Sequence, residues 1–207
     1  MADKQALRGS YNQAYRRPGP LFGLRPDPAL ARIVREHAPS GRALDIGAGD
    51  GRHSVFLARS GFLVEAVDIS EQAVGKLRQL ARRGHLRIEP RVGDCARPGV
   101  IAGPYDMIVA DTVLGHFEPD EARRVAGRIA AALAPGGWLF VTALADSDPR
   151  ESEFAELSWT YFTRAELIGL FPELRLERCE KLSIVDGTHG EPHRHHVLRL
   201  IAQREAG

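Results

Sequence analysis

The chain has 207 residues, of which 43% are hydrophobic and 27% are charged, and its formal net charge is +1. This composition is that of an ordinary globular protein, and a net charge so close to zero offers no general attraction to polyanions, so nucleic acid is not an expected partner. The polar N-terminus does not resemble a secretory signal, and no stretch has the roughly 18 apolar residues of a membrane-spanning helix. We therefore expect a cytoplasmic location and no membrane partner.

The length predicts one domain, because 207 residues can bury a full core but are few for two enzymatic domains. We place this domain at residues 27–207. Residues 1–26 are expected to form an N-terminal arm, since the stretch from Tyr11 to Pro26 is rich in arginine and broken by proline. Cys95 and Cys179 are too few and too far apart for a disulfide framework or a zinc site, which predicts two unpaired thiols.

From residue 27 onward the hydrophobic pattern alternates between helical and strand periods, which predicts βαβ units and a mostly parallel sheet with helices on both faces. Asp27 and Pro28 indicate a helix start. Runs of β-forming residues bounded by turn residues predict central strands at 43–46, 62–67, 105–110 and 138–142. A helical stripe of apolar residues follows at 122–133, and Pro135-Gly136-Gly137 is expected to end it.

The remainder of the chain completes the predicted sheet. Residues 146–158 have the composition of an exposed loop or mobile lid, and Thr163 to Glu166 has capping-box spacing at the head of a short helix. Residues 174–185 and 197–202 read as two strands joined by the turn-rich segment 186–192. The predicted fold class is therefore α/β: a Rossmann-like, doubly wound, mostly parallel seven-stranded sheet with a C-terminal antiparallel hairpin.

The loop Asp45-Ile46-Gly47-Ala48-Gly49-Asp50-Gly51 lies between a predicted strand and a predicted helix. Its glycines would let the backbone approach a ligand at a helix N-terminus, although a plain βα turn is the alternative. The dinucleotide fingerprint G-x-G-x-x-G does not fit, because Gly51 comes one position too early. The carboxylate of Asp45 suits an ammonium group better than a pyrophosphate, and S-adenosylmethionine carries an amino group and a sulfonium. We expect that cofactor to contact Asp45, Gly47, Ala48 and Gly49.

Acidic residues close the next predicted strands. Asp68, followed by Ile69, ends the second strand about 20 residues beyond the first glycine, where a carboxylate can accept the two ribose hydroxyls. A helix cap is the alternative for Asp68, although Ser70 could fill that role. Gly93-Asp94-Cys95 closes the third strand, where Asp94 could meet the adenine amino group or form an Asx-turn. The expected cofactor contacts outside the glycine loop are Asp68, Ile69, Asp94, Cys95 and Asp111.

In combination, Asp45-x-Gly47-x-Gly49-x-Gly51, Asp68, Gly93-Asp94 and Leu133-Ala134-Pro135-Gly136-Gly137-Trp138-Leu139 resemble the motifs of class I S-adenosylmethionine-dependent methyltransferases, over roughly residues 42–143. More narrowly, residues 51–58 and Gly190-Glu191-Pro192-His193-Arg194 resemble the tellurite-resistance methyltransferase family. Ala48 and Asp50 stand where that family tends to have Cys and Asn. The resemblance implies an enzyme with S-adenosylmethionine as methyl donor, and an N-terminal segment that folds over the cofactor as a lid; an unstructured arm is the alternative.

Methyl transfer from a sulfonium requires alignment of the acceptor, the methyl carbon and the sulfur, and a base only where the acceptor has a proton to lose. His116, after the fourth strand, is a candidate beside the acceptor, or else packs against Phe117. His193 and Arg194, the pair that matches the tellurite-resistance family, are expected to reach an anionic acceptor. The expected acceptor is a small molecule: a chalcogen oxyanion, thiol, amine or carboxylate. The alternatives are a protein or RNA acceptor, or a non-catalytic S-adenosylmethionine-binding module.

The histidines near the C-terminus also permit a metal site. If the segment is extended, His193 and His195 share one face, and together with His189 they could ligate an ion, whereas His196 points the other way. Ligands so close in sequence need a particular turn, so we favour the absence of a metal. A solvated polar loop is a further alternative.

Overall fold

The computed structural model of the chain describes residues 4–37, 40–149, 157, 159–187 and 191–206. A short 3₁₀ turn, Val113–His116, follows the fourth strand. The other described elements, in chain order, are α1 (Lys4–Ala14), α2 (Pro28–Glu36), β1 (Gly41–Ile46), α3 (Arg52–Arg59), β2 (Phe62–Asp68), α4 (Glu71–Arg83), β3 (Ile88–Val92), β4 (Tyr105–Asp111), α5 (Pro119–Ala132), β5 (Leu133–Leu144), α6 (Arg164–Gly169), β6 (Arg175–Asp186) and β7 (His193–Gln203).

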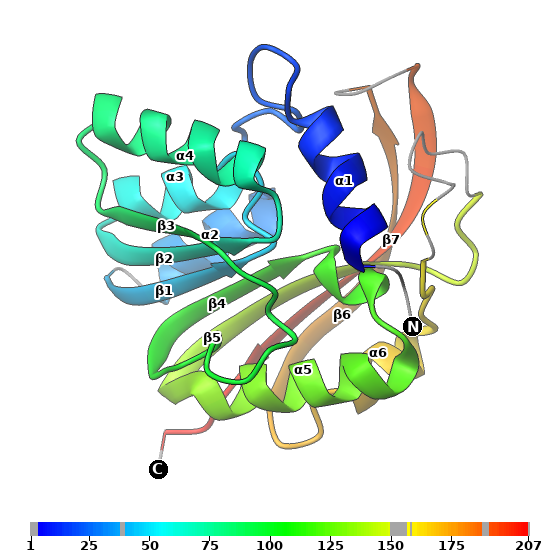
Figure 1. Cartoon of the computed structure of the whole chain (residues 1–207). Helices are drawn as coiled ribbons and strands as arrows, with labels where there is room; N and C mark the ends of the chain where they lie inside the picture. Colours follow the sequence, from blue (N-terminus) through cyan, green and yellow to red (C-terminus); the bar gives the residue numbers. More distant parts are fainter. Residues whose placement is uncertain (1–3, 38–39, 150–156, 158, 188–190, 207) are drawn as a thin grey trace.

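The strands form one seven-stranded sheet in the order β3-β2-β1-β4-β5-β7-β6. Strands β1 to β5 pair in parallel, and β7 is antiparallel to both of its neighbours. The predicted doubly wound α/β sheet with a C-terminal antiparallel hairpin is therefore confirmed (Figure 1). The strand order reverses between β1 and β4, which is where ligands bind in sheets of this kind, beyond the carboxyl ends of the strands.

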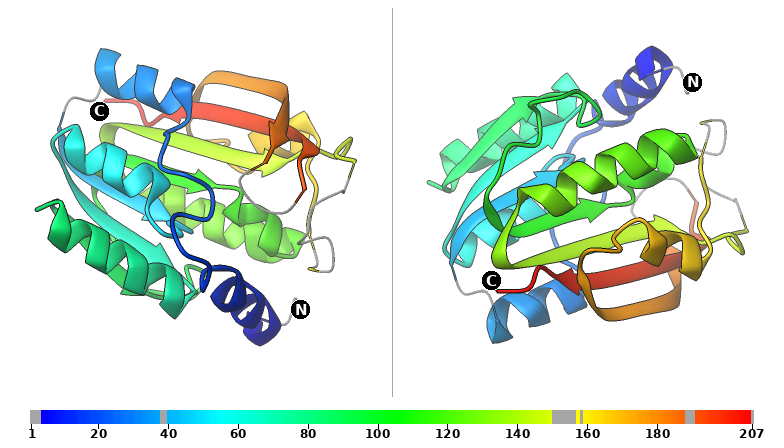
Figure 2. Two further views of the ribbon diagram at one scale, coloured as in Figure 1. Left: turned by 90° about the horizontal axis from the view of Figure 1, so that it is seen from above. Right: turned by 90° about the horizontal axis from the view of Figure 1, so that it is seen from below.

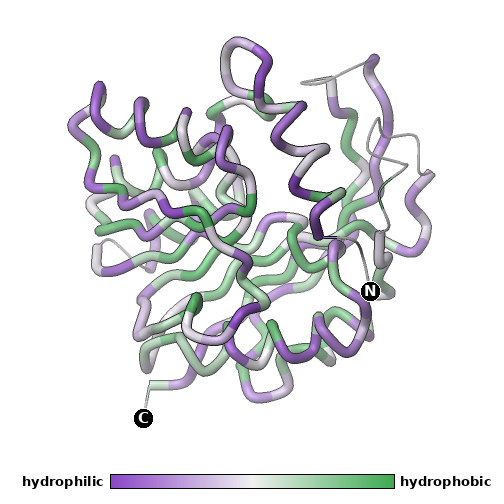
Figure 3. The backbone as a smooth tube through the Cα atoms, in the orientation of Figure 1, coloured by the Kyte–Doolittle hydropathy of each residue, from purple (hydrophilic) through white to green (hydrophobic). Residues whose placement is uncertain are grey.

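Helices cover both faces of the sheet (Figure 2). Leu30 of α2 and Leu57 of α3 pack with Phe140 on one face, whereas Ile129 of α5 and Leu167 of α6 pack in a cluster on the other. The central strands β1, β4 and β5 are apolar along most of their length because both of their faces are buried, as the hydropathy colours show (Figure 3). Among the described helices, none combines the length and the apolar composition needed to cross a bilayer.

Short-range caps start several of these helices where the sequence predicts them. Asp27 accepts a hydrogen bond from the backbone N–H of Ala29, with Pro28 in the first turn of α2. Thr163 and Glu166 form the predicted capping box of α6. Ser70 caps α4 through the N–H of Ala73, so Asp68 is not the cap of that helix.

The N-terminal segment, expected as an arm without regular structure, contains helix α1. Helix α1 has no fully buried residue, although its Tyr11 and Ala14 pack against the cluster that contains Tyr15. Long-range polar contacts hold it: Lys4 Nζ lies 3.0 Å from Asp94 Oδ2, and Ser70 Oγ donates to Asn12 Oδ1 at 2.7 Å. The following segment passes over the glycine loop and buries Tyr15.

Two further expectations need correction. Strand β7 begins at His193 and not at Val197, because Asp186 and His193 already pair across the hairpin, so the four residues 193–196 belong to the strand. The expected exposed loop at 146–158 contains Asp148, which is buried at 6% exposure. Residues 150–156 and 158 of that loop lie outside the described residues.

Candidate functional site

A cavity of about 250 Å³ lies at the carboxyl ends of the parallel strands. The glycine loop, the ends of β2 and β4, and the N-terminal segment contribute to its wall. Figure 1 shows α1 running across this edge of the sheet. The predicted site residues that line the cavity are Asp45, Gly47, Ala48, Gly49, Asp68, Ile69, Asp94, Cys95, Asp111 and His116. These residues come from β1, β2, β4, the 3₁₀ turn and the loops after β1, β2 and β3, and they converge because the fold brings strand ends to one edge.

The glycine loop has a backbone that other residues would strain. Gly47, Gly49 and Gly51 have φ angles of 68°, 55° and 108°, in the left-handed region that favours glycine. A Cβ atom on Gly49 would overlap the hydroxyl group of Tyr15. The loop therefore presents bare backbone to the cavity, with the N-terminal segment packed directly on it.

Asp45 and Asp68 line the cavity on either side of this loop and are both buried. Ser54 Oγ donates to Asp45 Oδ2 at 2.6 Å, and burial raises the pKa of Asp45. The two oxygens of Asp68 accept the backbone N–H groups of Gly49 and Ser70, each at 2.8 Å. Burial nevertheless raises the pKa of Asp68 to about 6, with Asp45 and Asp50 adding to the shift. These carboxylates are desolvated acceptors that a cationic or hydroxyl-bearing ligand would stabilise.

Of the two interpretations of Asp94, the Asx-turn is confirmed and the contact with the adenine amino group stays a prediction. Its Oδ1 accepts the N–H of Ala96 at 2.9 Å, which is an Asx-turn, and its Oδ2 faces the Lys4 ammonium at the cavity wall. The neighbouring Cys95 is a buried thiol, and burial raises its pKa to about 12. Cys95 is therefore a neutral wall residue at physiological pH.

His116 lies in the 3₁₀ turn after β4 and faces the N-terminal helix. Its Nε2 is 2.9 Å from the hydroxyl oxygen of Tyr11, and its ring centroid is 4.1 Å from that of Trp159. Burial lowers the pKa of His116 to about 4, so the ring is neutral near pH 7. Packing beside Phe117 therefore does not account for all contacts of His116, because His116 also lines the cavity.

Sequence reasoning assigned no role to His53, in the first turn of α3. His53 Nε2 lies 2.8 Å from Asp111 Oδ2, and Asp111 also accepts from the Thr142 hydroxyl. Burial opposes a charged imidazole, but the Asp111 carboxylate outweighs it and raises the pKa of His53. Burial alone would raise the pKa of Asp111, yet His53 and Arg52 lower it. The only sequence signal was the position of His53 directly after the glycine loop.

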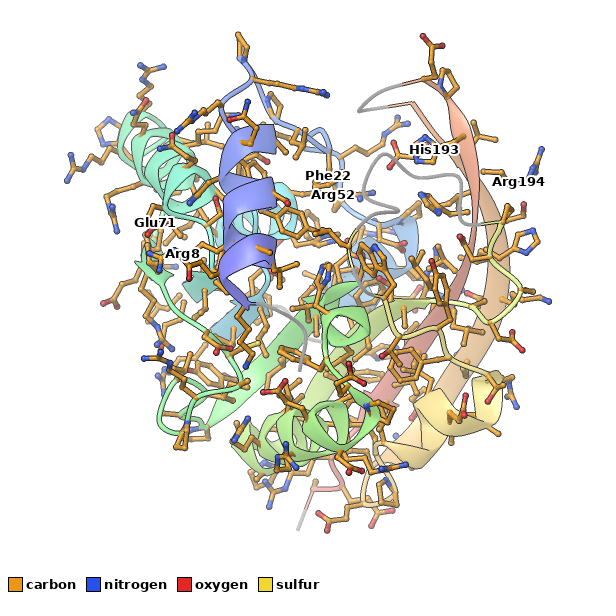
Figure 4. All side chains as sticks on the ribbon, turned by 45° about the vertical axis from the view of Figure 1, so that its right-hand side comes forward. Arg8, Phe22, Arg52, Glu71, His193 and Arg194 are labelled. Atoms are coloured by element: carbon orange, nitrogen blue, oxygen red, sulfur yellow. The ribbon has the colours of Figure 1, made fainter. Side chains whose placement is uncertain are left out.

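The residues at the start of β7 divide between the two faces of the strand (Figure 4). His193 is buried, and its Nδ1 lies 2.8 Å from the carbonyl oxygen of Glu191. Arg194 projects outward and donates to Ser183 Oγ at 3.0 Å. Neither His193 nor Arg194 lines the cavity, whereas His195 does. The acceptor role predicted for Arg194 remains a prediction that this orientation does not support.

The histidines do not assemble into a metal site in the part of the chain that the structure describes. His193 and His195 share a face as expected, with ring centroids 4.7 Å apart. Within the described ranges, no group of three or more His, Cys, Asp or Glu side chains is placed to hold an ion. His189, the third proposed ligand, lies outside the described residues.

Comparison with known proteins gives a family match over most of the chain. A family described as "Methyltransferase domain" matches residues 17–181. The ubiquinone biosynthesis O-methyltransferase of Caulobacter sp. (strain K31) is 36% identical over 105 residues, which are 50% of this chain and 40% of that protein. The ribosomal RNA small subunit methyltransferase C of Alcanivorax borkumensis is 36% identical over 106 residues, 50% of this chain and 32% of that protein. The chain thus spans half or less of the length of these curated relatives.

Solved structures share the fold at low sequence identity. TehB from Haemophilus influenzae superposes with a TM-score of 0.75 and 17% identity, over 96% of this chain and 67% of that one. A second structure superposes with a TM-score of 0.77 and 19% identity, over 97% of this chain and 93% of that one. Its description is "Conversion of a Disulfide Bond into a Thioacetal Group during Echinomycin Biosynthesis". These similarities concern the fold.

Proposed function

The chain belongs to the methyltransferase domain family, and from this premise we propose that it binds S-adenosylmethionine in the cavity at the strand ends and transfers its methyl group to a small-molecule acceptor. One observation carries the proposal: the described cavity lining has seven carboxylates, all aspartates, against three cationic side chains, Lys4, Arg52 and Arg199. S-adenosylmethionine has two positive groups and one negative group, so an acidic cavity fits its net charge.

The residues present fit the three parts of this ligand. Asp45 lies beside the glycine loop, where a buried carboxylate would hold the amino group. Asp68 ends β2 and already accepts two backbone N–H groups, and its remaining lone pairs would accept the ribose hydroxyls. Asp94 would meet the adenine amino group once Lys4 is displaced from it. When bound, the cofactor supplies an electrophilic methyl group on a sulfonium centre.

The protein's own contribution is to orient and to exclude water. Tyr15 and Phe22 of the N-terminal segment line the cavity, and their rings pack together with centroids 6.3 Å apart. Gly47 and Gly49 present only backbone to the cavity, so the ligand would lie between this backbone and the aromatic rings. Such an enclosure keeps water from competing with the acceptor. We propose on this basis that residues 1–26 act as a lid on the domain at 27–207.

The resemblance to the tellurite-resistance family places chalcogen oxyanions among the candidate acceptors. The structural similarity to TehB supports this resemblance, but at 17% identity the similarity concerns the fold. The curated relatives are named for ubiquinone biosynthesis and ribosomal RNA, so their substrates differ from one another. The names of these relatives therefore do not identify the acceptor of this chain.

Calorimetry and thermal shift test the cofactor assignment directly. S-adenosylmethionine and S-adenosylhomocysteine should raise the melting temperature, because a ligand that binds only the folded state stabilises it, whereas NAD should not. Labelled S-adenosylmethionine incubated with the protein and a small-molecule extract should yield a labelled product identifiable by mass spectrometry. Equal stabilisation by NAD would refute the cofactor assignment, and stabilisation without transfer would favour a binding module.

A further inference from the structure

We propose that His195, held by the buried carboxylate of Asp148, is the general base that removes a proton from a phenol-type hydroxyl acceptor bound against the β6–β7 hairpin. This inference rests on the proposed function, because it concerns the acceptor half of the same cavity. His195 lies on β7 and lines the cavity, and its Nδ1 is 3.0 Å from Asp148 Oδ2.

Asp148 is placed to fix the orientation and the tautomer of that ring. Its side chain is fully buried, at 0% exposure, and the same oxygen accepts the backbone N–H of His196 at 2.8 Å. The carboxylate is therefore anchored to the strand that carries His195. Because an ionised carboxylate can only accept, Nδ1 of His195 must donate, and the lone pair then resides on Nε2. Among the described residues, none hydrogen-bonds to Nε2.

The other two cavity histidines are less suited to this role. His53 uses Nε2 for Asp111, and its Nδ1 is buried out of reach of a ligand. His116 Nε2 is occupied by Tyr11, and burial lowers the pKa of His116 to about 4, which makes it a weak base. His195 alone among the three combines a carboxylate partner on one ring nitrogen with a second nitrogen left for the cavity.

The surface around His195 indicates an apolar body for the acceptor. Ile184 pairs with His195 across the hairpin and Leu182 pairs with Val197, so these side chains share one face of the two strands. All of them line the cavity. Ile184 is 42% exposed, so apolar area remains at this wall of the cavity for a ligand to bury.

The charges nearby disfavour an anionic acceptor. Arg199, the one cationic residue of β7 that lines the cavity, lies between Asp27 at 2.8 Å and Glu180 at 3.0 Å. Arg194 projects away from the cavity. Among the described residues, the titratable groups that face His195 are Asp148 in the loop after β5, His193 on its own strand and Asp186 on β6. Within the described lining, an oxyanion would meet carboxylates and only cations that are already paired, whereas a neutral hydroxyl would not be repelled.

A neutral hydroxyl acceptor must lose a proton, and this sets the chemistry. The O–H bond breaks, the proton moves to Nε2 of His195, and the bonding pair stays on the acceptor oxygen. That oxygen bonds to the methyl carbon, while the pair of the broken carbon–sulfur bond returns to sulfur. A phenol, with a pKa near 10, is within reach of an imidazole, whereas an aliphatic alcohol is far less acidic.

The test measures binding of 4-nitrocatechol, a coloured phenol, to the complex of the protein with S-adenosylhomocysteine. The variants compared with the wild type are His195→Gln, Asp148→Asn and His196→Gln. At a pH where the free phenol is protonated, the wild-type complex should bind it and show the phenolate absorbance. His195→Gln should remove this band, Asp148→Asn should weaken it, and His196→Gln, on the same strand but facing the other way, should retain it. The same band in His195→Gln, or no binding to the wild-type complex, would overturn the proposal.

Turnover gives a second readout. With S-adenosylmethionine, His195→Gln should lower methylation of the phenol by about 100-fold or more while its cofactor affinity by calorimetry stays at the wild-type value. Raising the pH until the phenol ionises by itself should restore kcat at saturating phenol, because the base is then unnecessary, whereas KM should rise because the acidic lining repels the phenolate. No rescue together with unchanged phenol binding would argue for a structural role. Failure of the wild-type protein to bind S-adenosylmethionine would refute the proposed function instead, and the two failures are thus distinguishable.

Discussion

The hydroxyl oxygen of Tyr11 lies 2.9 Å from Nε2 of His116, although the two residues are 105 positions apart in the chain. Burial raises the pKa of Tyr11, so the phenol stays protonated, and burial keeps His116 neutral. The contact is therefore an uncharged hydrogen bond that connects α1 to the turn after β4. It holds the N-terminal helix across the edge of the sheet where the cavity lies.

Replacing Tyr11 by Phe should lower the free energy of unfolding by about 1 kcal/mol, because one partly buried hydrogen bond is lost and an acceptor is left behind. Urea unfolding measures this difference. Arg16→Ala is a suitable control. The side-chain hydrogen bond that the structure describes for Arg16 goes to the exposed Gln13 three residues away, so its loss should change stability by a few tenths of that amount. An unchanged unfolding free energy in Tyr11→Phe would show that the contact does not stabilise α1.

Asp50 holds the segment that follows α1. Its Oδ2 accepts the backbone N–H of Leu21 at 2.7 Å in a buried setting, with Lys76 Nζ at 3.4 Å. Asp50→Ala should leave this N–H without its acceptor, cost about 1–3 kcal/mol, and speed amide exchange across residues 15–26. Hydrogen exchange read by mass spectrometry checks this. Asp120→Ala, which removes an exposed ion pair to Arg123, should leave exchange in that segment unaltered.

Gly49→Ala should abolish cofactor binding. Its φ of 55° disfavours a side chain, and the new Cβ would meet the Tyr15 hydroxyl and occupy the surface on which the ligand is proposed to lie. Calorimetry with S-adenosylmethionine measures the loss. Gly127→Ala is the matched control, because that glycine lies inside α5 with nothing within 4 Å of the added atom. Wild-type affinity in Gly49→Ala would remove the glycine loop from the proposed site.

The raised pKa of Asp68 predicts that the stability of the folded protein falls as the pH rises, which is opposite to the usual behaviour of a carboxyl group. Burial raises its pKa from 3.8 to about 6 in the folded protein, so the folded state binds this proton more tightly than the unfolded state does. Its contribution to stability is therefore present below about pH 4 and is lost as the pH rises through 6. Ribose hydroxyls would need the ionised carboxylate. Affinity for S-adenosylmethionine should accordingly fall by up to about tenfold per pH unit below 6.

The variant Asp68→Asn separates this titration from that of Asp45, whose pKa is also raised by burial. Calorimetric titrations from pH 5 to pH 8 should show weaker binding in the variant and a shallower slope near pH 6. The same slope in both proteins would assign the titration to another group. Unfolding experiments across the same range, without cofactor, test the stability half of the prediction independently.

Local sequence determined the parts of this protein that depend on neighbours in the chain. Three features of this kind are the strand periods, the capping box of Thr163 and Glu166, and the glycine spacing. Each arises within a few residues, because backbone geometry and local hydrogen bonds determine the conformation over that range. The motif order placed Asp45 and Asp68 at strand ends, and parallel strands bring such ends to one edge. The part of the cavity in which we propose that the cofactor binds could therefore be predicted from the sequence.

Only the tertiary structure decided two histidine–carboxylate pairs at the cavity. His53 of α3 lies 58 positions from Asp111, and His195 lies 47 positions from Asp148 in the loop after β5, so only the packing of separate elements brings these side chains together. The earlier start of β7 turned Arg194 outward and His195 inward, because a strand alternates its side chains between two faces. Sequence periodicity cannot specify a partner that lies dozens of residues away, since that contact depends on how separately formed elements pack.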